Sequence, residues 1–151
     1  MYALVYISKA NQPFEPSTLH ALADQANRRN RLLSITGFLT YKKGQFLQYL
    51  EGKEKAVDNL MNTIQNDPRH TVVKIINLPD QPQRYLSEWH MRYLSVSDLG
   101  AVSLDDLLVD TLNKLDTDIY SKEKVLEILR RILVRFSRYF EDKPTSFFPP
   151  L

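Results

Sequence analysis

The spacing of apolar residues along this 151-residue chain predicts an α+β domain with the element order β-α-β-β-α-β-β. Three observations support that order. An alternating stretch rich in β-forming residues opens the chain, two amphipathic stripes follow at helical spacing, and a Lys-Lys-Gly turn joins two apolar runs between those stripes. This order is typical of the ferredoxin-like arrangement, an antiparallel sheet with two helices on one face.

The first half of the chain is expected to form a strand, a helix and a hairpin. Residues 2–8 alternate and predict a strand, which Pro13 and its polar neighbours end. Apolar residues at helical spacing then predict a helix of about 12 residues that Ser17 caps. The runs 32–41 and 45–50 predict two antiparallel strands joined by a tight turn at Gly44.

The second half is expected to complete the sheet. Residues 56–64 carry a second helical stripe that stops near Pro68. The segment 71–78 predicts a strand, and a shorter strand is expected around 89–94.

The third strand is apolar on both sides, because Phe46 and Leu50 point one way while Leu47 and Tyr49 point the other. A sheet of this kind needs cover on both faces. Helical spacing in 104–112 and 125–140 predicts that the cover comes from the end of the chain. We therefore expect a domain at 1–95 and a helical cap with a tail at 96–151.

Composition narrows the classes of function. The chain has no cysteine, which excludes disulfides, thiolate nucleophiles and cysteine-bound metal. Its formal net charge of +2 gives no reason to expect nucleic acid, and no apolar run approaches the roughly 20 residues that span a bilayer. No catalytic triad, metal set or paired carboxylates is evident. The expectation is a cytoplasmic protein without metal, membrane insertion or enzymatic activity.

Gln48 is the unusual polar residue of the predicted sheet, since it shares a strand face with Phe46 and Leu50. A buried amide without a partner costs about 1–3 kcal/mol. Tyr6 on the first strand can supply the partner, because the first and third strands are neighbours in this topology. Two interpretations remain open at this point: a polar pair that only satisfies itself inside the core, and a pair that meets a ligand.

Several motifs in the chain resemble one known family. The segment SITGFLTYKKGQFLQYLEG, residues 34–52, resembles the signature hairpin of BLUF domains, which sense blue light using flavin. Tyr6, Asn30 and Gln48 stand where that family has its photoactive tyrosine, its flavin-binding asparagine and its switching glutamine. The resemblance extends over residues 1–95, and the chain looks like the short stand-alone, PixD-like type. Two departures, Arg29 and Leu86, affect contacts to the adenine end and local packing.

The resemblance implies a flavin site. The flavin would be FAD, with FMN or riboflavin left open, and its ring would lie between the two helices with Leu22 and Ile64 as apolar walls. Asn30 would bind the polar edge of the ring. The remaining candidates lie in two motifs further along, DPRH and WHM, and are Asp67, Arg69, His70, Trp89 and Met91.

Each of these later candidates has a simpler alternative. A charged pair after a helix is often a solvated helix end, and Asp67 can equally form a turn. Trp89 and Met91, which the family uses to relay its signal, can be ordinary core residues of the last strand.

The resemblance also implies a mechanism and an output. Tyr6 would transfer an electron and a proton to the excited flavin, and the Gln48 amide would then rotate or tautomerise, which shifts the flavin absorption to the red. The signal would pass through a homo-oligomer or to a separate signalling protein, which would be response-regulator-like or of another type. The cap helices with Phe147 and Phe148 would form the contact surface. Arginines at helical spacing could contact an acidic partner or form a solvated face: Arg130, Arg131, Arg135 and Arg138.

An RNA-binding domain is the main alternative, because one such fold shares this element order. The positions that would need stacking rings hold Gln45 and Leu47 instead. A phosphatase-like enzyme would need a glycine-rich anion loop, and the chain has only four glycines, none of them clustered.

Overall fold

The computed structural model describes residues 1–86, 88–95, 97–98 and 121–141 of the chain. Five strands form one mixed sheet in the order β4-β1-β3-β2-β5. β1 is antiparallel to both β3 and β4, β2 is antiparallel to β3, and β2 pairs in parallel with β5. The strands are β1 (Tyr2–Ala10), β2 (Thr36–Lys42), β3 (Gln45–Gly52), β4 (His70–Asn77) and β5 (Arg92–Leu94).

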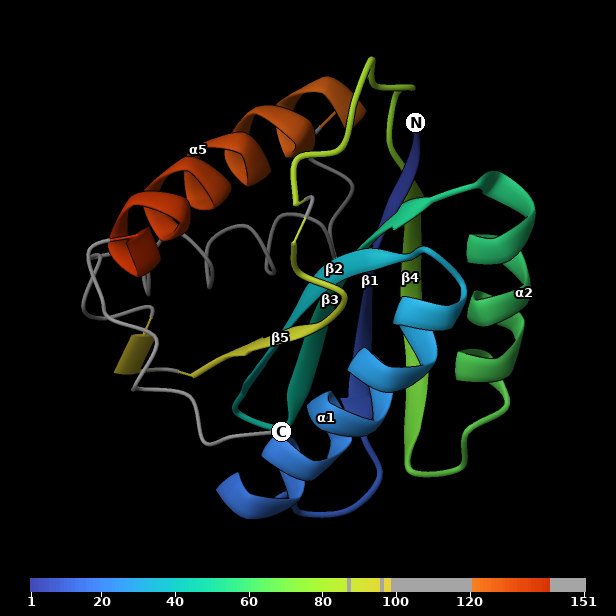
Figure 1. Ribbon diagram of the computed structural model, residues 1–151. Helices are drawn as coiled ribbons and strands as arrows, with labels where there is room; N and C mark the ends of the chain where they lie inside the picture. Colours follow the sequence, from blue (N-terminus) through green and yellow to red (C-terminus); the bar gives the residue numbers. More distant parts are fainter. Residues whose placement is uncertain (87, 96, 99–120, 142–151) are drawn as a thin grey trace.

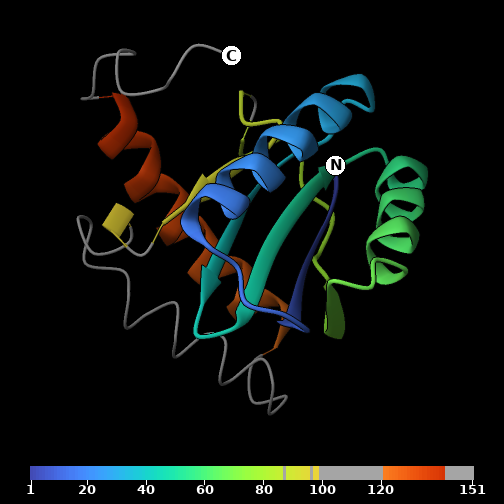
Figure 2. The same cartoon turned by 90° about the horizontal axis from the view of Figure 1, so that it is seen from below.

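Three helices in the described part of the chain cover the two faces of this sheet: α1 (Pro16–Leu32), α2 (Glu54–Gln65) and α5 (Lys122–Glu141). α1 and α2 lie on one face and α5 lies across the other, as Figures 1 and 2 show. The α+β ferredoxin-like fold with a helical cap is therefore confirmed. The expected helix at 104–112 and the tail with Phe147 and Phe148 lie outside the described residues.

Two apolar cores form because side chains alternate between the faces of the sheet. On the α1 and α2 side, strand residues such as Leu4 and Leu50 pack against Leu19, Leu60 and Ile64. On the other side, the core is built from β1, β2 and β3 residues together with Val125, Ile128, Leu129 and Ile132 of α5. The strand that was expected to be apolar on both sides is thus covered on both.

The hairpin between β2 and β3 has the predicted turn. Lys43 and Gly44 have φ values of 51° and 76°. Positive φ at both central residues is the geometry of the two-residue turn that matches the twist of antiparallel strands. Gly44 adopts it without strain, whereas Lys43 does so at some cost.

The ends of two predicted elements were wrong. α1 has 17 residues and begins at Pro16 with Glu15 at the cap, whereas the sequence pattern placed Ser17 there. Proline suits the first turn because its φ is already helical and its missing N–H is not needed there. The helix continues to Leu32, so β2 starts at Thr36 and not near residue 32.

The last strand is also shorter than expected. β5 contains only Arg92–Leu94. Trp89 and Met91 precede this strand, in the connection that follows β4. Periodicity in so short a segment could not distinguish a strand from an extended connection.

Among the described residues, no helix is long and apolar enough to cross a membrane.

Gly37 in β2 provides a test of the sheet packing. A Cβ at this position would clash with the Tyr49 carbonyl oxygen and lie 3.1 Å from its carbonyl carbon, whereas a Cβ at Gly44 would meet nothing within 4 Å. We expect Gly37→Ala to lower the free energy of unfolding by about 3 kcal/mol through backbone displacement. Gly44→Ala should cost only about 1 kcal/mol, from its positive φ. Urea unfolding of both variants measures the difference, and equal costs would contradict it.

Candidate functional site

A cavity of about 250 Å³ opens between α1 and α2 over the central strands of the sheet. Its floor contains Tyr6 of β1 and Gln48 of β3, and its mouth carries the polar residues that follow α2. The lining consists of Tyr6, Phe14, Leu22, Gln25, Ala26, Arg29, Leu39, Phe46, Gln48, Thr63, Ile64, Asp67, Arg69 and His70. Most of the residues that the sequence marked as candidates therefore meet in one place.

The Tyr6 and Gln48 side chains form a buried hydrogen bond on the floor of the cavity. The two residues stand directly opposite each other in the antiparallel register of β1 and β3. The Tyr6 hydroxyl donates to Gln48 Oε1, and both side chains are buried. Burial raises the pKa of the Tyr6 phenol well above its usual range, so the phenol stays protonated. At the other end of the amide, Gln48 Nε2 lies 3.6 Å from Met91 Sδ.

Part of the cavity wall is apolar. Leu22 of α1 and Ile64 of α2 line it, as do Phe14 and Phe46, whose rings meet edge to face with centroids 5.0 Å apart. A flat ring bound between the helices would therefore contact both Leu22 and Ile64. Sequence reasoning did not place Gln25 or Ala26 in the site and named Arg29 only as a departure from the family, although their spacing from Leu22 puts all three on one face of α1.

Asp67 and Arg69 pair with each other at the mouth. Arg69 donates from Nη2 to Asp67 Oδ2 at 2.6 Å and from Nε and its backbone N–H to Oδ1 at 3.0 Å. Hydrogen bonding to Arg69 is the main reason that the pKa of Asp67 falls to about 2. This tight turn after α2 matches the simpler alternative for both residues, and it leaves them at the edge of the cavity.

His70 forms part of the cavity wall and is held from two sides. Its Nε2 lies 2.9 Å from the Ile64 carbonyl oxygen, and its Nδ1 lies 2.7 Å from Ser8 Oγ. Because a carbonyl can only accept, Nε2 carries the proton, and in the neutral ring the Ser8 hydroxyl donates to Nδ1. The ring centroid of His70 lies 6.4 Å from that of Tyr6.

Asn30 lies near the cavity but does not line it. Its side chain is buried at the end of α1, where Nδ2 donates to the His90 carbonyl at 2.9 Å and Oδ1 accepts from Arg29 Nε at 3.3 Å. In this position Asn30 ties α1 to the connection before β5. Its contact with a flavin edge stays a prediction.

Met91 and Trp89 lie on opposite faces of the sheet. Met91 is buried in the core under α1 and α2, where it contacts Gln48. Trp89 packs against the core under α5, and the Arg92 guanidinium stacks 4.3 Å from its ring centroid. The sequence left open which of the two residues would be on the cavity side, and in this structure Met91 has that position.

A sequence model of the family described as BLUF, sensors of blue-light using FAD, matches residues 1–92. This match covers more than half of the chain. The chain belongs to the BLUF family. The family inferred from the motifs, that of blue-light sensors using FAD, is thereby confirmed, and the RNA-binding alternative is not favoured.

Two relatives contain a region similar to this chain. The photoactivated adenylate cyclase subunit beta of Euglena gracilis is 46% identical over 87 residues, which is 57% of this chain and 10% of that protein. The blue light- and temperature-regulated antirepressor BluF of Escherichia coli (strain K12) is 29% identical over 111 residues, or 74% of this chain and 27% of that protein. The chain therefore spans about a tenth of the length of the cyclase relatives that it matches.

Solved structures agree with the fold. The dark-state structure of the BLUF protein BlrB superposes with a TM-score of 0.67 at 26% identity, covering 90% of this chain and 96% of that one. A bacterial light-regulated adenylyl cyclase gives a TM-score of 0.64 at 28% identity, covering 75% of this chain and 34% of that one. Members of the BLUF family bind a flavin, and the matched region is a photosensory domain.

Filling the cavity should prevent flavin binding without unfolding the domain. Ala26 lines the cavity, whereas Ala21 is exposed on the same helix. We expect Ala26→Trp to yield a colourless protein because the indole occupies the space between the helices. Ala21→Trp, the matched control, should remain yellow. Visible absorption and circular dichroism of both variants test this, and a yellow, folded Ala26→Trp protein would contradict the assignment of the cavity.

The raised pKa of Tyr6 gives a prediction for stability at high pH. The folded pKa lies above the unfolded value of 10.0, so the contribution of this residue is fully present below pH 10 and is lost as the pH rises through the folded pKa. We expect Tyr6→Phe to lower the free energy of unfolding by about 1 kcal/mol at pH 8. The difference from the wild type should shrink at pH 11. Urea unfolding of both proteins at pH 8 and pH 11 measures this difference. An unchanged difference would show that the Tyr6 phenol has the same pKa in the folded and unfolded states.

Proposed function

We propose that this chain detects blue light through a flavin bound between α1 and α2, with Tyr6 as the electron and proton donor and Gln48 as the switching amide. The observation that carries the proposal is the buried hydrogen bond from Tyr6 to Gln48 on the floor of the cavity. A buried pair that only satisfied itself would not need an open cavity beside it. The membership of the family gives this arrangement its function.

The lining of the cavity fits a flavin. Leu22 and Ile64 offer apolar contact to the faces of a flat ring, while Tyr6 and Gln48 offer a donor and an acceptor at its edge. Asp67, Arg69 and His70 at the mouth, together with Asn30 behind it, are proposed to contact the polar edge and the ribityl chain. We propose FAD as the natural ligand, and the Arg29 guanidinium at the mouth suits the phosphates of FAD or FMN better than riboflavin. Mass spectrometry of the released flavin decides among the three.

When bound, the flavin supplies absorption of blue light and an electron acceptor in its excited state. Tyr6 is suited to give up an electron and a proton together, because its phenol stays neutral and its hydroxyl already points at Gln48 Oε1. The phenolic proton therefore has an acceptor in place before light arrives.

Gln48 is suited to switch because its two ends are held unequally. Its Oε1 accepts a hydrogen bond from a phenol, whereas its Nε2 faces only the thioether of Met91, which is a weak acceptor. Turning or tautomerising the amide therefore breaks no strong bond on the Met91 side. Such a change alters what the amide presents both to the cavity and to Met91.

For output we propose light-dependent association in the cytoplasm, either with a second copy of the chain or with a separate signalling protein that is response-regulator-like or of another type. The support comes from α5, whose exposed side includes Val134 together with Arg131 and Arg138. Arg131 pairs with Glu127, and Arg130 stacks on Tyr85, so part of the basic stripe is engaged within the chain. Size-exclusion chromatography in darkness and under blue light tests the association.

The spectroscopic test of the switch uses matched variants. Illumination of the wild type should shift the flavin absorption reversibly to the red, and Tyr6→Phe or Gln48→Ala should abolish the shift while flavin stays bound. Tyr41→Phe in β2 and Gln45→Ala in β3 make the same chemical changes outside the floor of the cavity. Both should keep the shift. Retention of the shift in Gln48→Ala would refute the role of the amide.

A further inference from the structure

Glu51 is a buried carboxylate on the α5 side of the sheet that the proposed photochemistry does not use. Its side chain is fully buried near the end of β3. Oε1 accepts hydrogen bonds from the Thr36 hydroxyl at 3.0 Å and the Leu86 backbone N–H at 2.7 Å. Oε2 accepts from the Tyr49 hydroxyl at 2.9 Å and the Tyr85 backbone N–H at 3.0 Å. Four donors are the full complement of an ionised carboxylate.

Two of these donors belong to the connector, which we define as the described residues 84–86 and 88–91 between β4 and β5. Hydrogen bonds to a charged group contribute about 1.5–3 kcal/mol each, more than neutral ones. Arg84 strengthens the same attachment, since its guanidinium donates to Ser34 O at 2.5 Å and to Glu51 O at 3.2 Å. The first part of the connector is therefore fixed to the start of β2 and the end of β3.

The last part of the connector is attached to the cavity side. Met91 Sδ contacts Gln48 Nε2, and the Met91 carbonyl accepts from Asn27 Nδ2 at 3.1 Å. Between the two ends, the Trp89 carbonyl accepts from the Gly37 backbone N–H at 2.7 Å. Gln48 and Glu51 thus hold opposite ends of the connector from opposite faces of the same strand, only three residues apart.

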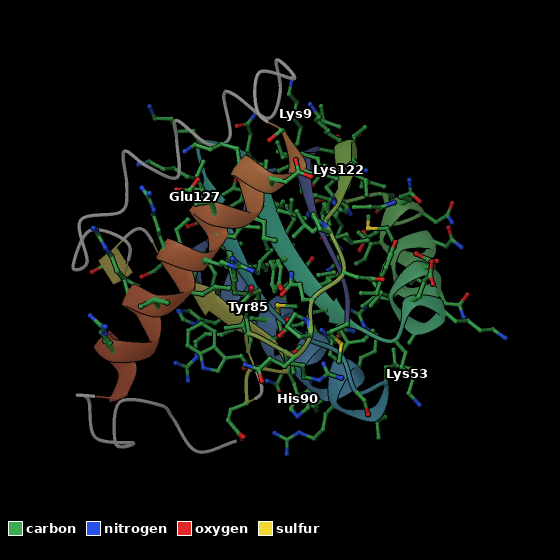
Figure 3. All side chains as sticks on the ribbon, turned by 90° about the horizontal axis from the view of Figure 1, so that it is seen from above. Lys9, Lys53, Tyr85, His90, Lys122 and Glu127 are labelled. Atoms are coloured by element: carbon green, nitrogen blue, oxygen red, sulfur yellow. The ribbon has the colours of Figure 1, made fainter. Side chains whose placement is uncertain are left out.

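The fixed end of the connector also contacts α5. The Tyr85 hydroxyl accepts a hydrogen bond from Arg130 Nε, and the Arg130 guanidinium lies 5.4 Å from the centroid of the Tyr85 ring. Leu86 is buried in the same core as Leu129 and Ile132 of α5. Figure 3 shows Tyr85 beside α5. A shift of this end of the connector would therefore change its contacts with α5.

We propose that Glu51 is a positioning residue for signal output, which clamps the Tyr85 and Leu86 end of the connector so that a change at the Gln48 and Met91 contact displaces α5. The physical reason is that the hydrogen bonds from Tyr85 and Leu86 to Glu51 join the connector to β3 as one unit. A change at Met91 then moves the Tyr85 contact with α5, whereas a loosely attached connector would absorb the change. The proposal rests on the proposed switching of Gln48. It adds the step by which that change crosses from one face of the sheet to the other.

Glu51→Gln is the informative variant because it keeps the size of the side chain. Each carboxylate oxygen serves one side-chain hydroxyl and one backbone N–H of the connector. Whichever way the new amide turns, its NH₂ group faces one of those backbone donors, and that attachment is lost. The cavity side, with Tyr6 and Gln48, is untouched.

The experiment measures the distance between α5 and the sheet in darkness and under blue light. The chain has no cysteine, so Val73→Cys on β4 and Glu123→Cys on α5, both at exposed positions, give a unique pair of spin-label sites. In the otherwise unchanged full chain we expect the distance distribution from double electron–electron resonance to change on illumination. In Glu51→Gln this change should be lost, while the flavin red shift keeps its full amplitude.

Two further variants complete the test. Glu127→Gln makes the same substitution at a solvent-facing pair on α5 and should keep the distance change. Tyr85→Phe leaves both backbone bonds to Glu51 but removes the hydroxyl that Arg130 binds, and it should reduce the distance change even if Glu51→Gln fails to fold.

A full distance change in Glu51→Gln or in Tyr85→Phe would overturn the proposal, as would a red shift in the parent protein without any movement of α5. Absence of the red shift from the parent protein would instead refute the proposed switching of Gln48, on which the clamp depends.

Discussion

The buried hydrogen bond between Tyr6 and Gln48 is the constraint on which the site depends. A phenol and an amide lie together in an apolar core, and either one alone would leave a polar group unsatisfied at a cost of about 1–3 kcal/mol. They meet only because β1 and β3 are neighbours in a register that sets the two residues opposite each other. A shift of that register by one residue would turn one of them to the other face and leave the cavity with a single polar group on its floor.

β3 is the element that connects the two faces of the molecule. Its alternation directs Gln48 into the cavity and sends Tyr49 and Glu51 to the α5 side. The connector passes from one face to the other beside β2, where the Trp89 carbonyl accepts from the Gly37 backbone N–H, with Met91 on one face and Trp89 on the other. In the proposed signalling step, a change buried under α1 and α2 reaches α5 on the opposite face, and a central strand with polar residues on both faces provides a physical link between them.

Much of the fold follows from local pattern. The element order and the apolar cover on both faces follow from apolar residues that recur every 2.0 residues in strands and every 3.6 residues in helices. The turn at Gly44 follows from the residue types that tight turns require. Tyr6 and Gln48 were predicted for the same reason, since topology and strand parity place them on one face. The errors are at boundaries. Pro16 starts α1 earlier than Ser17 would, and α1 continues through Leu32, a residue that a pattern of strand formers had assigned to β2.

The sequence by itself determined the order of the elements up to β5, the face that Tyr6 and the β3 residues occupy, and the family that carries these motifs. Only the tertiary structure decided that Met91, and not Trp89, contacts Gln48, and that Asn30 binds the His90 carbonyl. It also brought the backbone of Tyr85 and Leu86, some 35 residues along the chain, onto Glu51. The physical reason is that the connector has no periodicity of its own. Its path is set by long-range hydrogen bonds to groups that only the tertiary fold brings together.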